Sequence, residues 1–354
     1  MKFGIMCQLQ MPRPWSADAE RQAYRNAIEQ AVAAEEAGFD YFWITEQHFC
    51  IEIGHSACPE MTLAALSQLT TRIRLGFAVI ILPCHNPFMV AERVATLDVL
   101  SGGRAEFGCG RGAYPYIVEG LGLDPAMGRE LGRETLEAVL GMFEHEFFPG
   151  YKGEHLDLPA RHVIPRPIQH PHPPLWVAAS NLDTWAHAGR MGFGALGITH
   201  NTPDEMRPAI DAYRTAIRSP DRSARVGKFD NEHAGAFAIG VCLDDDREGR
   251  AVGCAAARWY FGENDAELNH VRFASGGALH SVAEKFAKRS DDELIEDARA
   301  IGGNPDTVSC QVEKWAGAGL DQLMFMFQSG RTSHEQAMRS IRLVGEKVIP
   351  RFTE

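Results

Sequence analysis

Short apolar runs along the chain predict a series of buried β-strands. Tyr41 to Ile44 have high β-propensity and no polar alternation, which is typical of a parallel strand covered on both faces. Similar runs recur at intervals that leave room for a helix between neighbours. The predicted strands span residues 2–9, 40–45, 73–82, 104–109, 175–179, 193–198, 234–242 and 323–327.

Helical periodicity and capping residues fill the intervals between these runs. Asn86 and Pro87 supply a cap and a first-turn proline, and Gly102 ends the helix that they begin. Thr202-Pro203-Asp204-Glu205 and Thr332-x-x-Glu335 match capping boxes of two later helices. The alternation of strand and helix predicts a (β/α)8 barrel. A doubly wound sheet is the alternative, but no Gly-x-Gly-x-x-Gly follows the first strand.

Two segments depart from the pattern within a single domain that spans residues 1–354. Residues 148–174 are rich in proline, histidine and aromatic residues, and we expect an insertion that contains a hairpin. Its histidines match no ligand spacing, so no metal site is expected. Residues 262–303 are charged and glycine-rich, and we expect a partly helical, mobile lid before the eighth strand.

Composition narrows the classes of function. Acidic residues exceed basic ones by 47 to 35, and the basic residues are scattered, so nucleic acid is not an expected partner. No apolar run approaches the ~20 residues of a membrane span, and the first residues do not predict a signal peptide. We therefore expect a cytoplasmic protein without membrane contact. Eight cysteines without a Cys-x-x-Cys pair predict reduced thiols.

Polar residues directly follow several predicted strands, at the end where a barrel places its chemistry. Glu46, Gln47 and His48 follow the second strand, and His85, after the third, is expected to line the pocket. In that position they are candidates for a catalytic site. The alternative is an ordinary loop with solvated polar residues.

The segment Gly110-Arg111-Gly112 after the fourth strand predicts an anion site. The glycines let backbone N–H groups approach a phosphate, and the guanidinium supplies charge and two donors. The helix that starts at Ser180-Asn181 adds its dipole. A phosphate-bearing cofactor is the expected ligand. The rival site is Gln328-Ser329-Gly330-Arg331 after the eighth strand, and the sequence does not choose between them.

A family resemblance rests on motifs along the whole chain. Glu46-Gln47-His48-Phe49 is one, and Phe107-Gly108-Cys109-Gly110-Arg111-Gly112 is another. With them, the chain resembles the bacterial luciferase-like, flavin-dependent monooxygenases. Together the motifs are specific for that family but not for a substrate. The other matching pieces are residues 2–4, 37–40, 75–83, 101–104, 177–180 and 348–350.

The resemblance implies a barrel that binds reduced FMN at its C-terminal face. Such proteins are usually homodimers and receive the flavin from a separate flavin reductase. At the matching positions Arg111 and Ser180, with Thr184 beside them, hold the phosphate. Ala78-Val79 corresponds to a non-proline cis peptide that lies against the isoalloxazine ring. The implied cofactor-binding residues are Ala78, Val79, Gly110, Arg111, Gly112, Ala178, Ala179, Ser180 and Thr184.

Two departures from the family pattern concern light emission. The light-emitting enzymes have two adjacent histidines after the glutamate, and the first, treated as the catalytic base in light emission, is Gln47 here. Their reactive cysteine falls at Gly110, and Cys109, one residue earlier, is expected to point to the opposite face. The resemblance therefore implies a monooxygenase that does not emit light.

We hypothesise that reduced FMN and O2 form a C4a-peroxyflavin that transfers one oxygen atom to a small apolar organic substrate. His48 would donate a hydrogen bond or move a proton, with Glu46 and Gln47 orienting it. A structural role for His48 is the alternative. Two further alternatives are deazaflavin-dependent hydride transfer and non-catalytic flavin binding. The aromatic candidates for apolar pocket walls are Phe49, Trp176 and Phe325.

Overall fold

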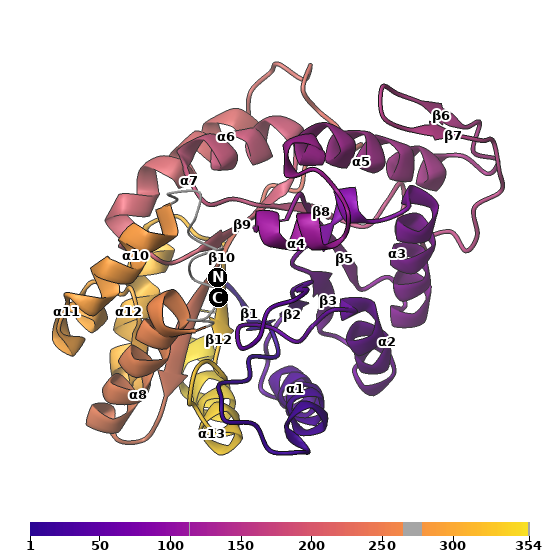
Figure 1. Cartoon of the computed structure of the whole chain (residues 1–354). Coiled ribbons are helices and arrows are strands. Elements are labelled where there is room, and N and C mark those ends of the chain that lie inside the picture. The colour runs from indigo at the N-terminus through magenta and orange to yellow at the C-terminus, as the bar shows by residue number, and fades with distance from the viewer. Residues whose placement is uncertain (113, 265–277, 353–354) are drawn as a thin grey trace.

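The chain folds into a closed barrel of eight parallel strands with helices around it (Figure 1). The computed structural model describes residues 1–112, 114–264 and 278–352. β1 pairs with β12, and Gly4 lies opposite Met324 at this closing seam. The prediction of a (β/α)8 barrel is thereby confirmed, and a doubly wound sheet is excluded. The barrel strands are β1 (Lys2–Cys7), β2 (Tyr41–Ile44), β3 (Arg74–Phe77), β5 (Ala105–Gly110), β8 (Leu175–Ala178), β9 (Gly194–Ile198), β10 (Ala234–Cys242) and β12 (Gln322–Met326).

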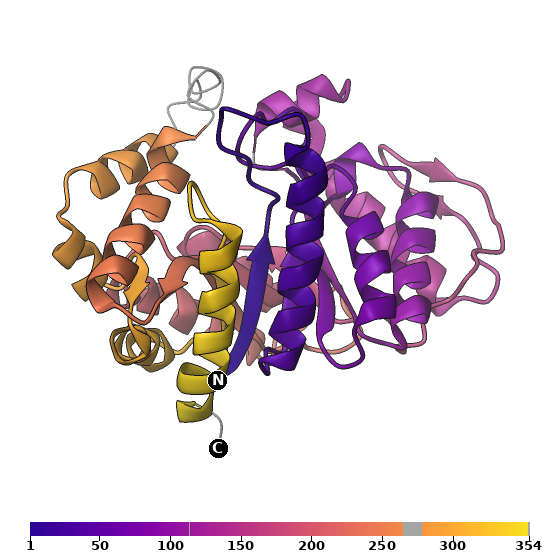
Figure 2. The ribbon, with the colours of Figure 1, turned by 90° about the horizontal axis from the view of Figure 1, so that it is seen from below.

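Helices cover the outside of the barrel, and their ends follow the capping residues. Asn86 accepts the N–H of Phe88, and Gly102 ends the same helix in the left-handed conformation with φ 66°, as predicted. Figure 2 shows α1 and α13 beside β1. No helix in the described ranges is long and apolar enough to cross a membrane. The main helices are α1 (Ala19–Glu36), α2 (Pro59–Leu69), α3 (Pro87–Ser101), α4 (Pro115–Gly120), α5 (Gly128–Glu144), α6 (Leu182–Met191), α7 (Pro203–Ile217), α8 (Asp246–Arg258), α12 (Pro305–Gly317) and α13 (His334–Leu343).

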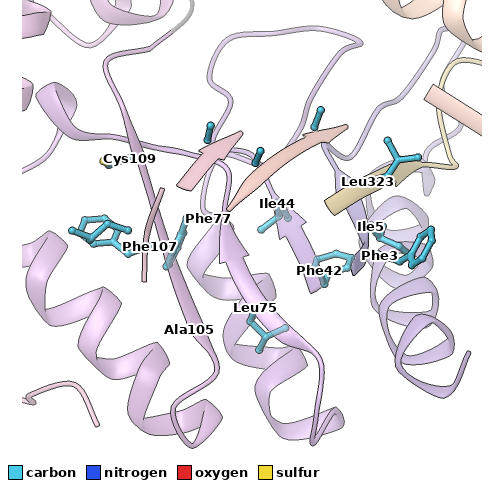
Figure 3. Close-up of a cluster of buried hydrophobic side chains, with 14 of the residues drawn as sticks. Phe3, Ile5, Phe42, Ile44, Leu75, Phe77, Ala105, Phe107, Cys109 and Leu323 are labelled. Carbon is cyan, nitrogen blue, oxygen red and sulfur yellow. The ribbon is translucent and has the colours of Figure 1, made fainter. Parts of the chain in front are cut away.

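Side chains of each strand alternate between two cores. The outward set packs against the helices, and ten of its members are labelled in Figure 3. The inward set fills the barrel and includes Trp43 and Trp176. A Cβ added at Gly76 would lie 2.1 Å from the Trp43 ring, so these indoles fit because their neighbours are glycines. The interior is packed, which leaves the ends of the strands for a ligand.

The predicted insertion contains the expected hairpin. β6 (Tyr151–Lys152) and β7 (Asp157–Leu158) pair antiparallel. The Glu134 carboxylate of α5 accepts the backbone N–H groups of Glu154, His155 and Leu156 at 2.9 to 3.0 Å. One buried side chain thus anchors the hairpin to the barrel.

The segment predicted as a lid contains regular elements. α10 (Ala278–Ala287) and α11 (Asp291–Glu296) lie beside α8, and β11 (Ile301–Gly303) pairs with β10. Residues 265–277 of the predicted lid lie outside the described residues. The described part is therefore helical and joined to the sheet, as the partly helical pattern indicated.

Several predicted boundaries differ from the structure, among them the cap of the last helix and the end of the third strand. The last helix is capped by Ser333 and Gln336, one residue later than the predicted Thr332-x-x-Glu335. Both windows fit the capping pattern, but Thr332 is buried and its N–H bonds to the Ser329 carbonyl. The third predicted strand, residues 73–82, is divided in the structure. β3 ends at Phe77, and a second short strand, β4 (Ile80–Ile81), follows it.

Candidate active site

A buried carboxylate, that of Glu46, follows β2 at the strand ends. Its side chain is 2% exposed, and its Oε1 lies 2.8 Å from His48 Nε2 and 2.7 Å from His85 Nε2. Its Oε2 accepts the N–H of Ile81 at 2.8 Å. The structure therefore joins residues from the ends of β2 and β4 through one carboxylate.

Glu46 stays ionised despite its burial. Burial alone would raise the pKa of this carboxyl, but hydrogen bonds from both histidines and from the Ile81 N–H outweigh it and lower the pKa to about 2. A buried anion with three donors is a fixed counter-charge. It can hold a neighbouring imidazole in place and balance a positive charge that forms on it.

Gln47 is not part of this arrangement. Its Oε1 lies 3.6 Å from the Cys50 thiol, and a Cβ added at Gly54 would lie 2.7 Å from its side chain. Among the described residues it has no hydrogen bond to His48. The structure brings Glu46 and His48 together as the sequence suggested, but it does not place Gln47 to orient His48.

His85 is the residue that sequence reasoning underrated, because it was expected only to line the pocket. Its hydrogen bond to Glu46 joins positions 39 residues apart in sequence. The signal was its position after the third predicted strand, next to the strand that precedes Glu46. Neighbouring parallel strands bring such residues together, but the pairing depends on strand register.

The peptide bond Ala78-Val79 is cis, as the resemblance implied. Both residues are half-buried and pack at the edge of the inward core. A Cβ added at Gly110 would lie 2.5 Å from Val79 Cγ2, so only glycine fits beside this segment. The arrangement leaves an apolar surface between β3 and β5 at the barrel mouth.

Arg111 is exposed and has no ion pair or hydrogen bond among the residues that the structure describes. It is flanked by Gly110 and by Gly112, which has φ 89°. A Cβ added at Gly128, the first residue of α5, would lie 3.9 Å from Arg111 Cβ. The next residue of α5, Arg129, therefore follows a backbone position that is close to Arg111. Arg129 was not singled out from the sequence. The guanidinium of Arg111 is available for an anionic ligand.

The start of α6 borders a cavity of about 100 Å³. Ser180 is exposed there, whereas the Thr184 hydroxyl accepts the N–H groups of Ser180 and Asn181 and donates to the Asn181 carbonyl. Thr184 therefore serves the capping box of α6 and has little capacity left for a phosphate. Ala178 is exposed and Ala179 is buried beside this helix start.

Charges of both signs surround the same cavity, since the Glu205 carboxylate lines it and Lys285 and Arg299 lie near it. His200 and Asn201 line it, and Lys285 of α10 donates to Asn201 Oδ1 at 3.3 Å. Burial and the charges of Lys285 and Arg299 lower the pKa of His200. The helix dipole at the α6 start and Lys285 favour an anion there, whereas the Glu205 carboxylate on the same lining opposes it.

The rival anion segment after β12 is already engaged. The Gly330 N–H donates to Gln10 Oε1 at 3.2 Å, and Ser329 is fully buried. Arg331 donates to the Arg13 carbonyl at 3.2 Å. The geometry therefore favours the region of Arg111 over this segment.

Cys109 lies in the outward core, as its position predicted. Its thiol donates to the Trp176 carbonyl at 3.4 Å, and burial raises its pKa to about 12. All eight cysteines are free thiols. The inward position of β5 is Gly110, so this strand presents no thiolate to the barrel mouth.

Of the three aromatic candidates for pocket walls, one is at the surface. Trp176 is 1% exposed and Phe325 is fully buried, so both belong to the cores. Phe49 is 47% exposed, and its ring lies 6.0 Å from that of His48 and 6.3 Å from that of Tyr116. It is the aromatic residue placed beside the histidine pair.

No group of three His, Cys, Asp or Glu side chains in the described ranges is placed to hold a metal ion. The arrangement instead provides an anion-binding edge at Arg111 and α6, an apolar surface at Ala78 and Val79, and two imidazoles on Glu46. These features fit a ligand that carries a phosphate and a flat apolar ring system.

Comparisons with known proteins find similarity along nearly the whole chain. Residues 1–322 match the family model described as luciferase-like monooxygenase. The chain is 40% identical over 353 residues to limonene 1,2-monooxygenase of Rhodococcus erythropolis, which covers 96% of this chain and 84% of that protein. A structure of the monooxygenase RslO1 from Streptomyces bottropensis superimposes with a TM-score of 0.81 at 26% identity, with both chains fully covered.

Two other relatives are described with cofactors that differ from each other. The oxygenase component of flavin-dependent trigonelline monooxygenase of Acinetobacter baylyi is 23% identical over 360 residues, which cover 100% of this chain and 96% of that protein. The F420-dependent glucose-6-phosphate dehydrogenase of Amycolatopsis mediterranei is 25% identical over 361 residues, which cover 96% of this chain and 97% of that protein. Similar chains therefore use different flavin-type cofactors.

Proposed function

Because the chain belongs to the luciferase-like monooxygenase family, we propose that it is an FMN-dependent monooxygenase of a small apolar organic substrate. The observation that carries the proposal is Arg111, which is unpaired among the described residues and directly follows Gly110, the residue that packs against Val79. A phosphate at Arg111 would place an attached ring system over Ala78 and Val79. FMN has this combination of groups.

The residues present fit the cofactor. Arg111 and Ser180 would hold the phosphate, with the dipole of α6 and the nearby Lys285 adding positive potential. Ala178 and Ala179 would flank the cofactor from β8. Reduced FMN, when bound, supplies the activation of O2. The closed packing below the mouth limits water around it.

His48 would hold or move a proton at the reacting end of the site. The hydrogen bond to Glu46 engages Nε2 of His48, which leaves Nδ1 available to a bound ligand. A fixed imidazole beside an anion can take up a proton with little reorganisation. Phe49 would contribute an apolar wall next to it.

The substrate class is supported by the similarity to limonene 1,2-monooxygenase. A flavin reductase would supply reduced FMN in trans, and one relative is described as an oxygenase component.

We also propose a homodimer. Neighbouring helices α2 and α3 expose apolar side chains that a second copy would cover, namely Met61, Leu69, Met89, Val99 and Leu100.

The proposal is tested by turnover with limonene as a probe. The purified protein is mixed with FMN, NADH, a flavin reductase and ¹⁸O2, and products are analysed by mass spectrometry. We expect a product that carries one ¹⁸O atom and that forms only when FMN is present. Formation of no labelled product with limonene and other small alkenes or ketones would count against the proposal.

A second candidate function is hydride transfer with a deazaflavin. It is favoured by the similarity to an F420-dependent dehydrogenase. In that case reduction of a substrate would proceed without O2, and reduced F420 would bind in place of FMN. Anaerobic oxidation of reduced F420 by the protein in the presence of a substrate distinguishes the two functions.

A further inference from the structure

Two imidazoles share one buried carboxylate oxygen. His48 and His85 both bond Glu46 Oε1, and Ile81 N–H occupies Oε2. The histidine side chains are 18% and 20% exposed, whereas that of Glu46 is 2% exposed. The pair thus remains accessible at the strand ends, while its counter-charge is enclosed.

This geometry determines which ring nitrogen carries the hydrogen. An ionised carboxylate only accepts hydrogen bonds, and a neutral imidazole has a single N–H. Each Nε2 must therefore carry the hydrogen, and each Nδ1 keeps a lone pair. Neither Nδ1 bonds any of the described residues. The site presents two acceptor nitrogens, one from the end of β2 and one that follows β4.

We propose that His85 is the second functional imidazole of this site and accepts a proton at Nδ1 from a hydroxyl or N–H group of a bound ligand. The proton adds to Nδ1, and the Nε2–H stays on Glu46, whose negative charge compensates the imidazolium. The ligand keeps the electron pair, and no other bond changes. The identity of the ligand rests on the proposed function.

Neighbouring groups do not provide the same capacity. The Cys84 thiol precedes His85, and burial together with the charge of Glu46 raises its pKa to about 11. It therefore stays protonated at neutral pH. Gln47 has an amide, which is not basic, and its side chain lies beside Gly54. Proton uptake at this position falls to the two histidines.

The tautomers are tested in the free protein, which needs no flavin. Histidine labelled with ¹⁵N is followed by long-range ¹H–¹⁵N correlation at pH 8, and His48→Gln and His85→Gln assign the signals. We expect the Nε2–H tautomer for both residues, and an Nδ1–H population when Glu46→Gln removes the anionic acceptor. An Nδ1–H tautomer of His85 in the unmodified protein overturns the proposal.

The role of Nδ1 is tested by two variants. His85→Gln keeps an N–H donor toward Glu46 but has no basic nitrogen, whereas His85→Ala lacks both. We expect both variants to lower turnover about 100-fold. The control is His55→Gln, since His55 bonds Glu20 and the Ile51 carbonyl away from Glu46. We expect this control to retain unmodified turnover.

Unchanged turnover of His85→Gln would show that His85 only positions Glu46 and would refute the proposal. If the unmodified protein shows no turnover with FMN, the proposed function fails. The tautomer measurement still decides the His85 proposal in that case, so the two failures are distinguishable. Thermal unfolding of each variant establishes that it is folded.

Discussion

His85 Nε2 lies 2.7 Å from Glu46 Oε1, the oxygen that His48 also contacts. Two segments far apart in sequence are thereby tied through one enclosed anion. The fold thereby brings the imidazoles of His48 and His85 together on Glu46.

The first prediction concerns Glu46 and pH. Its pKa is lowered from 4.5 to about 2 in the folded protein, so the ionised form stabilises the fold. By linkage this contributes about 3 kcal/mol at neutral pH, which is fully present above the unfolded value and lost as the pH falls through about 2. Glu46→Gln should therefore be less stable by about 3 kcal/mol at pH 7. Urea unfolding at pH 3 should show about half that difference, and an equal difference at both pH values would contradict it.

The second prediction concerns Arg111 and the phosphate. Arg111→Met should weaken FMN binding about 10- to 100-fold, because a charge-assisted hydrogen bond is lost. Riboflavin lacks the phosphate, and its affinity should not change. Quenching of flavin fluorescence measures both affinities. Lys152→Met, on the exposed hairpin, is the control. Equal weakening of FMN and riboflavin would place the phosphate elsewhere.

The third prediction concerns Lys285 of α10. Its amino group bonds Asn201, and its charge reaches His200 and Glu205, all of which line the cavity at the α6 start. Lys285→Met should weaken FMN binding about threefold at low salt, less at high salt. Lys288 directly follows α10 and forms an exposed ion pair with Glu284, so Lys288→Met should bind FMN as the unmodified protein does. Identical affinities for both variants would exclude Lys285 from the cofactor's surroundings.

The fourth prediction concerns a charge inside the barrel. Glu106 is fully buried, pairs with Arg74, and accepts the Trp176 N–H at 2.5 Å. Glu106→Gln should lower the free energy of unfolding by about 1 to 2 kcal/mol, because Arg74 loses a charged acceptor but keeps its hydrogen bond to Gln169. Denaturation followed by tryptophan fluorescence measures this. Asp157→Asn removes an exposed pair with Lys152 and should change little; a similar loss in both variants would contradict the buried-pair interpretation.

The fifth prediction concerns the hairpin of the insertion. Glu134 is 1% exposed on its side chain and accepts three backbone N–H groups at residues 154–156. Glu134→Gln should raise the rate of limited proteolysis at residues 151–158 about tenfold, since charge-assisted hydrogen bonds are weakened. Glu130→Gln, on the exposed first turn of the same helix, is the matched control. A cleavage rate equal to that of the control would show that other contacts anchor the hairpin.

Sequence reasoning predicted the elements whose signals are local. The seventh strand at 234–242 and the helix between Asn86 and Gly102 match the structure because apolar runs and caps act within a few residues. It misplaced the cap of α13, since Thr332 and Ser333 both fit the pattern and tertiary burial of Thr332 decides. Local sequence signals thus predict that a helix or strand exists more reliably than they predict where it begins and ends.

The sequence predicted which residues follow the strands at the candidate site, but it did not predict which of their side chains contact one another. The end of β2 indicated Glu46 and His48, yet the bond from His85 requires the relative register of two strands. Phe325 and Trp176 were candidates for pocket walls because the sequence does not show which face of a strand is covered. The structure assigns both to cores. Non-local pairing is the information that one sequence lacks.

The measurement that tests the central claim most directly is anaerobic titration of the protein with reduced FMN and, separately, with reduced F420. Oxygenated buffer is then admitted, and the rate of flavin oxidation is compared with that of free flavin. We predict that reduced FMN binds and that its oxidation by O2 differs from the reaction in free solution. Binding of reduced F420 without binding of reduced FMN would contradict the proposed function and establish the deazaflavin alternative.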